Sequence, residues 1–221
     1  DLLRELKLEK DTIVFFTGDN GGQDRFRSKK SPRGFFGPNV NPKTGVEFRG
    51  GKGNLFEGGL RIPYLVRWPG RINSGQVNDL IFYQPDVLPT LAELTGAKAP
   101  NDIDGISILP TLLNQGQQEK HEMLYWEFRS QIAVRKQNWK AIQTKPNRAW
   151  ELYDLNKDIS ETTNIAVKHP DVLAKMKSFA KASHEPVIIG KYLDSNRSKH
   201  ERDRRAKWGT AKEASKARRK K

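Results

Sequence analysis

The stretch Asp11–Gly22 reads DTIVFFTGDNGG and joins an apolar run to a polar, glycine-rich end. The β-branched and aromatic residues of the run predict a buried strand. Gly21 and Gly22 allow the backbone to turn sharply after that strand. Ahead of the run, the leucines within residues 2–6 have helical spacing. The sequence therefore predicts a helix and then a buried strand that ends in a tight turn, as in an α/β unit.

Asp19 and Asn20 stand at the end of this strand and offer one carboxylate and one amide oxygen. Oxygen donors of this kind suit a divalent cation such as Ca²⁺ or Mg²⁺. Ligands of open α/β sheets bind at the carboxyl ends of the strands, which favours a site at this position. The same residue types also form ordinary Asx turns, so the pattern by itself leaves both interpretations open.

A second glycine-rich segment, Gly50–Pro63, reads GGKGNLFEGGLRIP. Lys52 stands among glycines, so its ammonium group and nearby backbone N–H groups can face the same anion. The segment is not a phosphate-binding P-loop, because Lys52 is followed by Gly53 rather than by Ser or Thr. A flexible turn with a solvated lysine is the alternative.

The remaining chain predicts one more strand, two helices and a set of hairpins. Leu60–Pro69 alternates as a strand does, and Gln84–Gly96 has a helical apolar stripe that ends at a glycine. His169–Phe179 predicts an amphipathic helix that packs on a small antiparallel sheet. The strands of that sheet are expected at Leu124–Phe128, Ile132–Arg135, Trp139–Ile142 and Glu151–Leu155.

Six aromatic residues fall at strand-like positions in the second half of the chain. Core packing is their ordinary role, and stacking on a sugar ring is the alternative for one or two of them. They are Tyr125, Trp126, Phe128, Trp139, Trp150 and Tyr153.

Composition excludes several classes of protein. The 221 residues include 40 Lys and Arg against 26 Asp and Glu, which gives a net charge of +14, and no Cys. No apolar run of about 18 residues exists, so no membrane-spanning helix is expected. Without Cys, disulfides, zinc–thiolate clusters and thiol nucleophiles are excluded within this chain.

Most of the positive charge lies at the C-terminal end. Residues 190–221 hold 13 Lys and Arg against 4 Asp and Glu, a net charge of +9, and almost no large apolar side chain. We expect this tail to be disordered and able to contact a polyanion, whether nucleic acid, anionic lipid or sulfated polysaccharide, through salt-sensitive contacts. Charge alone favours none of these partners.

The polar loop from Gln23 to Val46 is longer than an ordinary connection. Its basic side chains suit a polyanionic glycan, and a solvated loop is the alternative. These side chains are Arg25, Arg27, Lys29, Lys30 and Arg33.

Together, the two glycine-rich segments resemble the formylglycine-dependent (type I) sulfatases, the arylsulfatase family of the alkaline phosphatase superfamily. The resemblance rests on Phe16–Gly21 (FTGDNG), Gly50–Pro63 and Trp68–Gly70 (WPG) in this order, and it covers residues 1–185. It implies an α/β fold, namely the C-terminal part of an alkaline-phosphatase-like sheet sandwiched by helices, followed by a small antiparallel sheet with a packing helix. Further matching segments are Tyr83–Leu91, Asp104–Leu109 and Glu151–Asn164.

The resemblance also implies domain limits. Residues 1–115 would be the C-terminal portion of the catalytic α/β domain, residues 116–190 the small sheet with its helix, and residues 191–221 the basic tail. It places the protein in the periplasm, outside the cell or in the lysosome.

The resemblance assigns roles to matching residues. Asp19 and Asn20 would be ligands of an active-site Ca²⁺, and Lys52 would be a catalytic residue that contacts the sulfate oxygens of the substrate. For Glu57 and Arg61, which belong to the same motif, a buried ion pair that holds the turn and a contact with substrate both stay open.

The family nucleophile is expected outside this chain. Formylglycine is made from Cys or Ser in a Cys-x-Pro-x-Arg type motif, but the chain has no Cys, and Ser31–Arg33 (SPR) has the wrong spacing. We therefore expect a fragment that is inactive by itself. The histidines lie outside the matching motifs, and none is expected to be catalytic; they are His121, His169, His184 and His200.

The predicted function is the hydrolysis of sulfuric esters, with a sulfated small molecule or glycan as substrate and no specific nucleic acid as partner. A phosphodiester or phosphonate hydrolase of the same superfamily is one alternative, because a cation and a lysine suit either tetrahedral anion. A non-catalytic polyanion-binding module is the other alternative.

Overall fold

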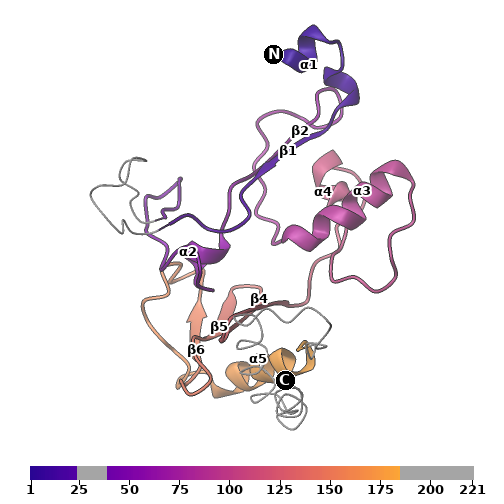
Figure 1. Ribbon diagram of the computed structural model, residues 1–221. Helices are drawn as coiled ribbons and strands as arrows, with labels where there is room; N and C mark the ends of the chain where they lie inside the picture. Colours follow the sequence, from indigo (N-terminus) through magenta and orange to yellow (C-terminus); the bar gives the residue numbers. More distant parts are fainter. Residues whose placement is uncertain (24–38, 185–221) are drawn as a thin grey trace, which may run out of the picture. The chain divides into compact units, whose positions relative to one another are not determined.

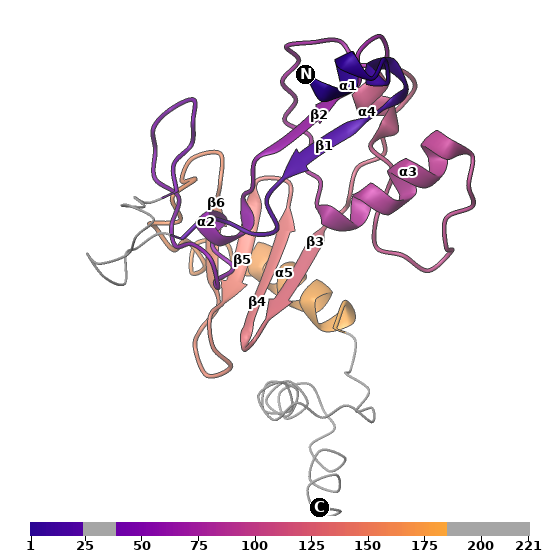
Figure 2. The same cartoon turned by 45° about the horizontal axis from the view of Figure 1, so that its top comes forward.

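The computed structural model describes residues 1–23 and 39–184 (Figures 1 and 2). The chain folds as two compact units, and each unit is built from two separate stretches of sequence. The domain limits expected at residues 115 and 190 stay predictions. The first unit comprises Asp1–Asp19 and Ile62–Glu122, and the second comprises the described parts of Asn20–Arg61 and Met123–Lys221.

Two sequence predictions concern residues outside this description. One is the basic tail at residues 191–221. The other is the set of basic side chains expected to meet a glycan, which are Arg25, Arg27, Lys29, Lys30 and Arg33.

The first unit contains a two-stranded antiparallel sheet. Strands β1 (Val14–Thr17) and β2 (Tyr64–Arg67) pair with Phe16 opposite Leu65, so both predicted strands are confirmed. The predicted burial of β1 is wrong, because Phe16 is 63% and Leu65 59% exposed. Paired residues share one face of a sheet, and within the described residues of this unit that face is not covered.

Short helices make up the rest of the first unit. The helix predicted over Gln84–Gly96 is confirmed, and it ends at Gly96 with a left-handed φ of +70°, a conformation that glycine adopts without strain. The helix at residues 109–113 has no counterpart among the sequence predictions. The helical elements are α1 (Leu2–Glu5), η1 (Glu9–Asp11), η2 (Gln84–Asp86), α3 (Val87–Thr95) and α4 (Leu109–Leu113).

Asp86 ties α3 to the segment that leads into α4. Its buried carboxylate accepts hydrogen bonds from the backbone N–H groups of Tyr83 (3.0 Å) and Ile106 (2.8 Å). Thr90 Oγ1 donates to the Asp86 carbonyl (2.6 Å) and accepts from the Ile108 N–H (3.0 Å). Two of the sequence segments that carry the family resemblance therefore form one hydrogen-bonded scaffold.

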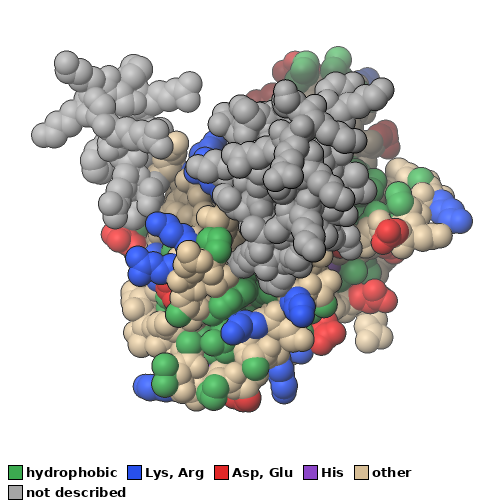
Figure 3. Space-filling view, turned by 60° about the horizontal axis from the view of Figure 1, so that its bottom comes forward, with side chains coloured by type: hydrophobic (Ala, Val, Ile, Leu, Met, Phe, Trp, Pro, Cys, Tyr) green, Lys and Arg blue, Asp and Glu red, His purple; other side chains and the backbone are tan. Residues whose placement is uncertain are grey.

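The second unit is built around a four-stranded antiparallel sheet in the order β3-β4-β5-β6. All four predicted strands and the predicted helix are confirmed, and the helix begins at a proline as expected. Figure 3 views this unit from the side of α5 and shows hydrophobic side chains with Lys and Arg side chains among them. The elements are α2 (Glu57–Leu60), β3 (Leu124–Phe128), β4 (Gln131–Lys136), β5 (Trp139–Gln143), β6 (Glu151–Asp154) and α5 (Pro170–Ala182).

The two faces of this sheet carry separate hydrophobic clusters. Ala141 and Ile142 are neighbours on β5, yet Ala141 packs in the cluster that includes Met176 of α5, whereas Ile142 packs with Leu55 and Phe56. Successive side chains of a strand point to opposite faces, which explains the division. The sheet is therefore a middle layer between α5 and the segment that leads into α2 (Figures 1 and 2).

The six aromatic residues differ in their burial. Tyr153 is 1% exposed and belongs to the core, whereas Phe128 at the end of β3 is 40% exposed, so core packing is wrong for Phe128. The other four are partly buried and pack against the two clusters; they are Tyr125, Trp126, Trp139 and Trp150. Within residues 1–23 and 39–184, no helix is long and apolar enough to cross a membrane.

Candidate active site

The predicted site residues are Asp19, Asn20 and Lys52. The first two are adjacent in sequence, and the last two belong to the same compact unit. Asp19 is exposed and is the last residue of the first stretch of the first unit. Asn20 follows it directly, is half-buried, and belongs to the second unit together with the exposed Lys52. Asn20 and Lys52 therefore lie in one compact unit, and Asp19 is the residue directly before Asn20 in the chain.

The backbone joins the two glycine-rich segments within the second unit. The Gly21 N–H donates to the Gly59 carbonyl (3.0 Å), and the Lys52 N–H donates to the Gly22 carbonyl (2.8 Å). A Cβ atom on Gly21 would lie 1.9 Å from the Gly58 carbonyl oxygen, so only glycine permits this approach. The residues after Asn20 and the residues around Lys52 therefore form one backbone assembly.

Two side chains hold the loop of Lys52 from opposite ends. Gln131 at the start of β4 accepts from the Leu55 N–H (3.2 Å) and donates to the Gly53 carbonyl (3.1 Å). Arg49 donates through Nη1 to the Tyr153 hydroxyl (2.8 Å) and to the Glu161 carbonyl (2.9 Å). The antiparallel sheet thus supports the loop that presents Lys52.

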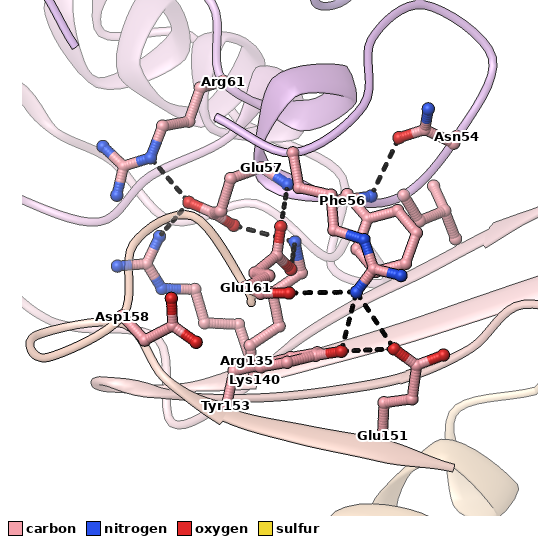
Figure 4. A network of polar contacts seen from close by, with 12 residues as sticks. Asn54, Phe56, Glu57, Arg61, Arg135, Lys140, Glu151, Tyr153, Asp158 and Glu161 are labelled. Carbon is pink, nitrogen blue, oxygen red and sulfur yellow. Dashed lines mark hydrogen bonds and ion pairs between the residues drawn. The ribbon is translucent and has the colours of Figure 1, made fainter. Parts of the chain in front are cut away.

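Arg49 also lies beside an anionic group and an aromatic ring. Its Nη1 is 3.1 Å from Glu151 Oε2, and its guanidinium lies 3.9 Å from the centre of the Phe56 ring. Burial and the hydrogen bond to the Glu151 carboxylate raise the pKa of Tyr153, so its hydroxyl stays protonated and donates to Glu151. Figure 4 shows this group of contacts.

Glu57, at the start of α2, is the centre of a buried ionic network (Figure 4). Its side chain is 2% exposed and lies 2.5 Å from Arg61 Nε, 2.9 Å from Lys140 Nζ and 3.8 Å from Arg135 Nη1. Burial by itself raises the pKa of Glu57, but the positive charges of Lys140, Arg61 and Arg135 outweigh it and lower the pKa to about 2. Glu57 and Arg61 form an ion pair in which Glu57 is buried and Arg61 is 39% exposed, so the scaffold role has a structural basis and a contact of Arg61 with substrate stays a prediction.

Lys140 and Glu161 complete this network. Lys140, on β5, is fully buried, and its Nζ lies 2.8 Å from Glu161 Oε1. Glu161 Oε2 accepts the Glu57 N–H (2.6 Å), and its backbone has a left-handed φ of +52° that is strained for a non-glycine residue. Burial and the nearby negative charge of Glu57 raise the pKa of Glu161 despite the opposing effect of Lys140.

Lys140 was missed at the sequence level, although a signal was present. The strand around it reads WKAIQ, in which Lys140 alternates with the apolar Ala141 and shares a face with Ile142. A lysine on the apolar face of a strand requires a buried carboxylate partner. The sequence does not say which carboxylate that is.

The first unit holds a buried carboxylate–histidine pair. His121 Nε2 lies 2.8 Å from Asp86 Oδ1, and the ring of His121 meets the ring of Tyr83 edge-on at 5.0 Å. Because the Asp86 carboxylate also binds two backbone N–H groups, this pair fastens the scaffold around α3.

The residues present fit part of a calcium site. Asp19 and Asn20 supply a carboxylate and an amide oxygen, the hard donors that Ca²⁺ takes, but Ca²⁺ binds roughly six to eight oxygens. Among the residues that the structure describes, no group of three or more His, Cys, Asp or Glu side chains is arranged to hold a metal ion. These two residues therefore fit a partial ligand set.

Two sequence families match the chain. The family described as N-sulphoglucosamine sulphohydrolase, C-terminal, matches residues 51–184, which is more than half of the chain. The family described as sulfatase matches residues 1–97.

Individual proteins show the same likeness. Steryl-sulfatase from Mus musculus is 41% identical over 154 residues, which cover 66% of this chain and 24% of that protein. The N-acetylgalactosamine-6-O-sulfatase of Bacteroides thetaiotaomicron is 31% identical over 192 residues, which cover 79% of this chain and 36% of that protein. The chain thus spans between about a quarter and just over a third of the length of these relatives.

Solved structures share the fold. A sulfatase from a study of glycosaminoglycan metabolism by Bacteroides thetaiotaomicron aligns with a TM-score of 0.63 and 26% identity, over 81% of this chain and 40% of that one. The phosphonate monoester hydrolase of Agrobacterium radiobacter aligns with a TM-score of 0.61 and 22% identity, over 83% of this chain and 37% of that one. The expected fold is thereby confirmed.

Proposed function

We propose that this chain, which belongs to the sulfatase family of the alkaline phosphatase superfamily, supplies the C-terminal part of an active site that hydrolyses sulfate esters. The observation that carries the proposal is the backbone assembly of the two glycine-rich segments. It supports the proposal because Asn20 and Lys52 belong to one unit and the Gly22–Lys52 and Gly21–Gly59 hydrogen bonds join the segments that carry them.

Lys52 would bind and stabilise the sulfate group. Its exposed ammonium group stands on a loop held by Gln131 and Arg49, so it can meet an anionic oxygen without large rearrangement. Asp19 and Asn20 would hold Ca²⁺, which when bound supplies positive charge to the sulfate oxygens. The chain has no Cys, and Ser31–Arg33 lacks the spacing of the formylglycine motif, so no nucleophilic step is assigned to this chain.

The substrate would be a sulfated small molecule or glycan. The relative from Mus musculus is named for steryl sulfate, a small-molecule sulfate. The relative from Bacteroides thetaiotaomicron is named for N-acetylgalactosamine 6-O-sulfate, a sugar sulfate. The compartment inferred from the family resemblance is the periplasm, the cell exterior or the lysosome.

The test uses the product of the complete gene with 4-nitrocatechol sulfate as substrate. Lys52→Ala should lower kcat at least about a hundredfold, since it removes a charge that faces the reacting group. Lys43→Ala, which removes another exposed lysine of the same unit, is the control. Normal turnover in Lys52→Ala would sink the assignment.

Calcium content gives a second readout of the same site. Asp19→Ala and Asn20→Ala should each lower bound Ca²⁺ together with turnover, whereas Lys52→Ala should leave bound Ca²⁺ unchanged. We expect the 221-residue chain by itself to show no turnover. Measurable hydrolysis by the pure chain would contradict this expectation.

A phosphonate or phosphodiester hydrolase is the second candidate, favoured by the shared fold of the Agrobacterium enzyme. Rates measured on matched sulfate and phosphonate esters separate the two, because the sulfatase proposal requires the sulfate ester to react faster. A non-catalytic polyanion-binding module is the third. Unchanged heparin and DNA binding after deletion of residues 196–221 would remove the reason for it.

A further inference from the structure

A cavity of about 520 Å³ opens to solvent in the second unit, on the side of the sheet that α5 covers. Its walls come from the end of β5, the segment before β6, the segment before α5, and α5 itself. Its volume is in the range of small-molecule sites. Figure 3 views the molecule from this side and shows hydrophobic side chains with Lys and Arg side chains among them.

The cavity and the loop of Lys52 lie on opposite faces of the sheet. Gln143, which lines the cavity, is two residues from Ala141 on β5 and therefore points to the same face, toward α5. Lys140 and Ile142 point to the other face, where Lys140 meets Glu57. The cavity is thus separate from the site proposed above.

Gln143, which lines the cavity, carries a buried acceptor that lacks a donor. The residue is 7% exposed, and its Nε2 donates to the carbonyls of Arg148 (2.7 Å) and Pro146 (3.3 Å), which fixes the orientation of the amide. Its Oε1 is buried and has no hydrogen-bond partner among the described residues. An unpaired buried acceptor costs free energy, so a ligand hydroxyl or N–H group that displaced the packing around Oε1 and reached it would be favoured.

The rest of the lining combines positive charge, a donor and an aromatic ring. Arg148 and Lys177 are exposed cationic side chains that form no ion pair within the described part of the chain, and none of the described residues that line the cavity is acidic. Asn164 Oδ1 accepts from the backbone N–H groups of Leu152 and Ala166 (both 3.0 Å), which leaves its Nδ2 as a donor. The half-buried Trp150 packs on the α5 cluster and also lines the cavity.

We propose that this cavity binds one anionic hexose unit, sulfated or carboxylated. Trp150 would lie against the apolar face of the sugar ring, and Gln143 Oε1 would accept a hydroxyl proton. Arg148 and Lys177 would bind the anionic group. This site does not depend on the proposed sulfatase activity, because it is defined by binding on the opposite face of the sheet.

Calorimetric titration of the chain at low ionic strength tests the proposal, with glucose 6-sulfate and glucuronic acid as probes and with glucose and inorganic sulfate as controls. Millimolar binding of one or both anionic sugars, at least about fivefold tighter than glucose and inorganic sulfate, is expected. The two probes distinguish a sulfated from a carboxylated ligand. Equal binding of glucose, equal binding of inorganic sulfate, or no binding of either probe would each overturn the proposal.

Variants assign the binding to this cavity. Lys177→Gln and Arg148→Gln should each weaken binding of the preferred probe about three- to fivefold, the effect expected for an exposed charge pair. Lys175→Gln changes an exposed lysine of the same helix outside the cavity and should leave binding unchanged. Trp150→Phe should weaken binding while its ring still packs on the core. If Lys175→Gln matched Lys177→Gln, the cavity would not be the site.

Discussion

Lys140 is a fully buried lysine whose ammonium group lies between two carboxylates, 2.9 Å from Glu57 Oε1 and 2.8 Å from Glu161 Oε1. Glu57 also pairs with Arg61, whose Nε lies 2.5 Å from Glu57 Oε2. Desolvation of three charged groups is costly, and their mutual attraction offsets it only while all three are present. Lys140 therefore links α2, β5 and the segment after β6 through charge rather than through apolar contact.

Loss of this lysine should destabilise the second unit strongly. Lys140→Met leaves Glu57 and Glu161 buried with less compensation and should lower the free energy of unfolding by about 3–5 kcal/mol. Urea denaturation measures the change, with Lys145→Met at an exposed lysine as the control. The double variant Lys140→Met/Glu161→Gln should recover part of the loss. A change below about 1 kcal/mol in Lys140→Met would show that the network does not stabilise the fold.

The two carboxylates should affect the pH dependence of stability with opposite signs. The folded pKa of Glu57 is about 2, below its ordinary value of 4.5, so its stabilising contribution is present above pH 4.5 and is lost as pH falls toward 2. Glu57→Gln should therefore flatten the loss of stability in acid. Urea midpoints measured between pH 2 and pH 6 provide the comparison.

Glu161 supplies the matched case. The pKa of Glu161 is raised in the folded protein. Its contribution to the free energy of unfolding is therefore fully present below its ordinary pKa of 4.5 and is lost as pH rises through its pKa in the folded protein. Glu161→Gln should remove the loss of folding free energy that Glu161 causes as pH rises. The free energy of unfolding should then fall more steeply toward acid in Glu161→Gln than in Glu57→Gln. Identical pH profiles for the two variants would contradict the opposite pKa shifts.

At the scale of elements, the turn after β1 meets α2 and the loop before α2 through backbone contacts that leave no room for side chains. Gly58 and Gly59 of α2 are crowded in turn by the loop before the helix, since a Cβ on them would lie 2.0 Å from the Gly50 carbonyl oxygen and 2.1 Å from the Asn54 carbonyl oxygen respectively. Asn39 Nδ2 links the turn after β1 to α2 by donating to the carbonyls of Gly22 and Gly58, both at 2.9 Å. The position of the Lys52 loop next to the residues after Asn20 therefore depends on the close approach of two backbone segments.

A methyl group at Gly21 should separate the two turns. Gly21→Ala places Cβ against backbone, which cannot move aside, whereas Gly22→Ala meets the side chain of Asn39 at 2.5 Å, and that side chain can rotate. We expect faster hydrogen exchange at the amides of residues 52 and 58–61 in Gly21→Ala and a smaller change in Gly22→Ala. Equal protection in both variants and the parent chain would argue against the close approach.

At the scale of the whole molecule, apolar surface is unevenly distributed. The sheet of the second unit is covered on both faces, whereas the β1–β2 sheet of the first unit exposes the cross-strand pair Phe16 and Leu65. An exposed apolar pair on a strand at the edge of a sheet, as β1 is, is an interaction surface or an aggregation hazard.

This exposed pair should bind a hydrophobic dye. The chain should enhance the fluorescence of 8-anilinonaphthalene-1-sulfonate, and the double variant Phe16→Ser/Leu65→Ser should lower that enhancement by about half or more. Val77→Ser, which changes an isolated valine that is 73% exposed, should leave it unchanged. An equal effect of Val77→Ser would mean that the dye does not report on the sheet.

Local sequence patterns predicted most elements of this fold. Periodicity located the strands of the second sheet, Pro170 and Gly96 marked the start of one helix and the end of another, and the glycine-rich motifs located the candidate site. The pattern did not predict α4, which has only five residues. It also did not predict the exposure of β1, because an apolar run indicates that a strand can pack against another layer but does not show that such a layer is present.

The sequence by itself determined most of the helices and strands, which of their residues are apolar, and which residue types stand at Asp19, Asn20 and Lys52, because these features follow from short-range periodicity and from glycine and proline. Only the tertiary structure decided which groups meet. Lys140 reaches Glu57 across 83 positions of sequence, and Gln143 faces α5 rather than Glu57 because of the pleat of β5. A buried charge or acceptor requires a partner, but the identity of that partner depends on chain packing between distant segments, which local patterns do not record.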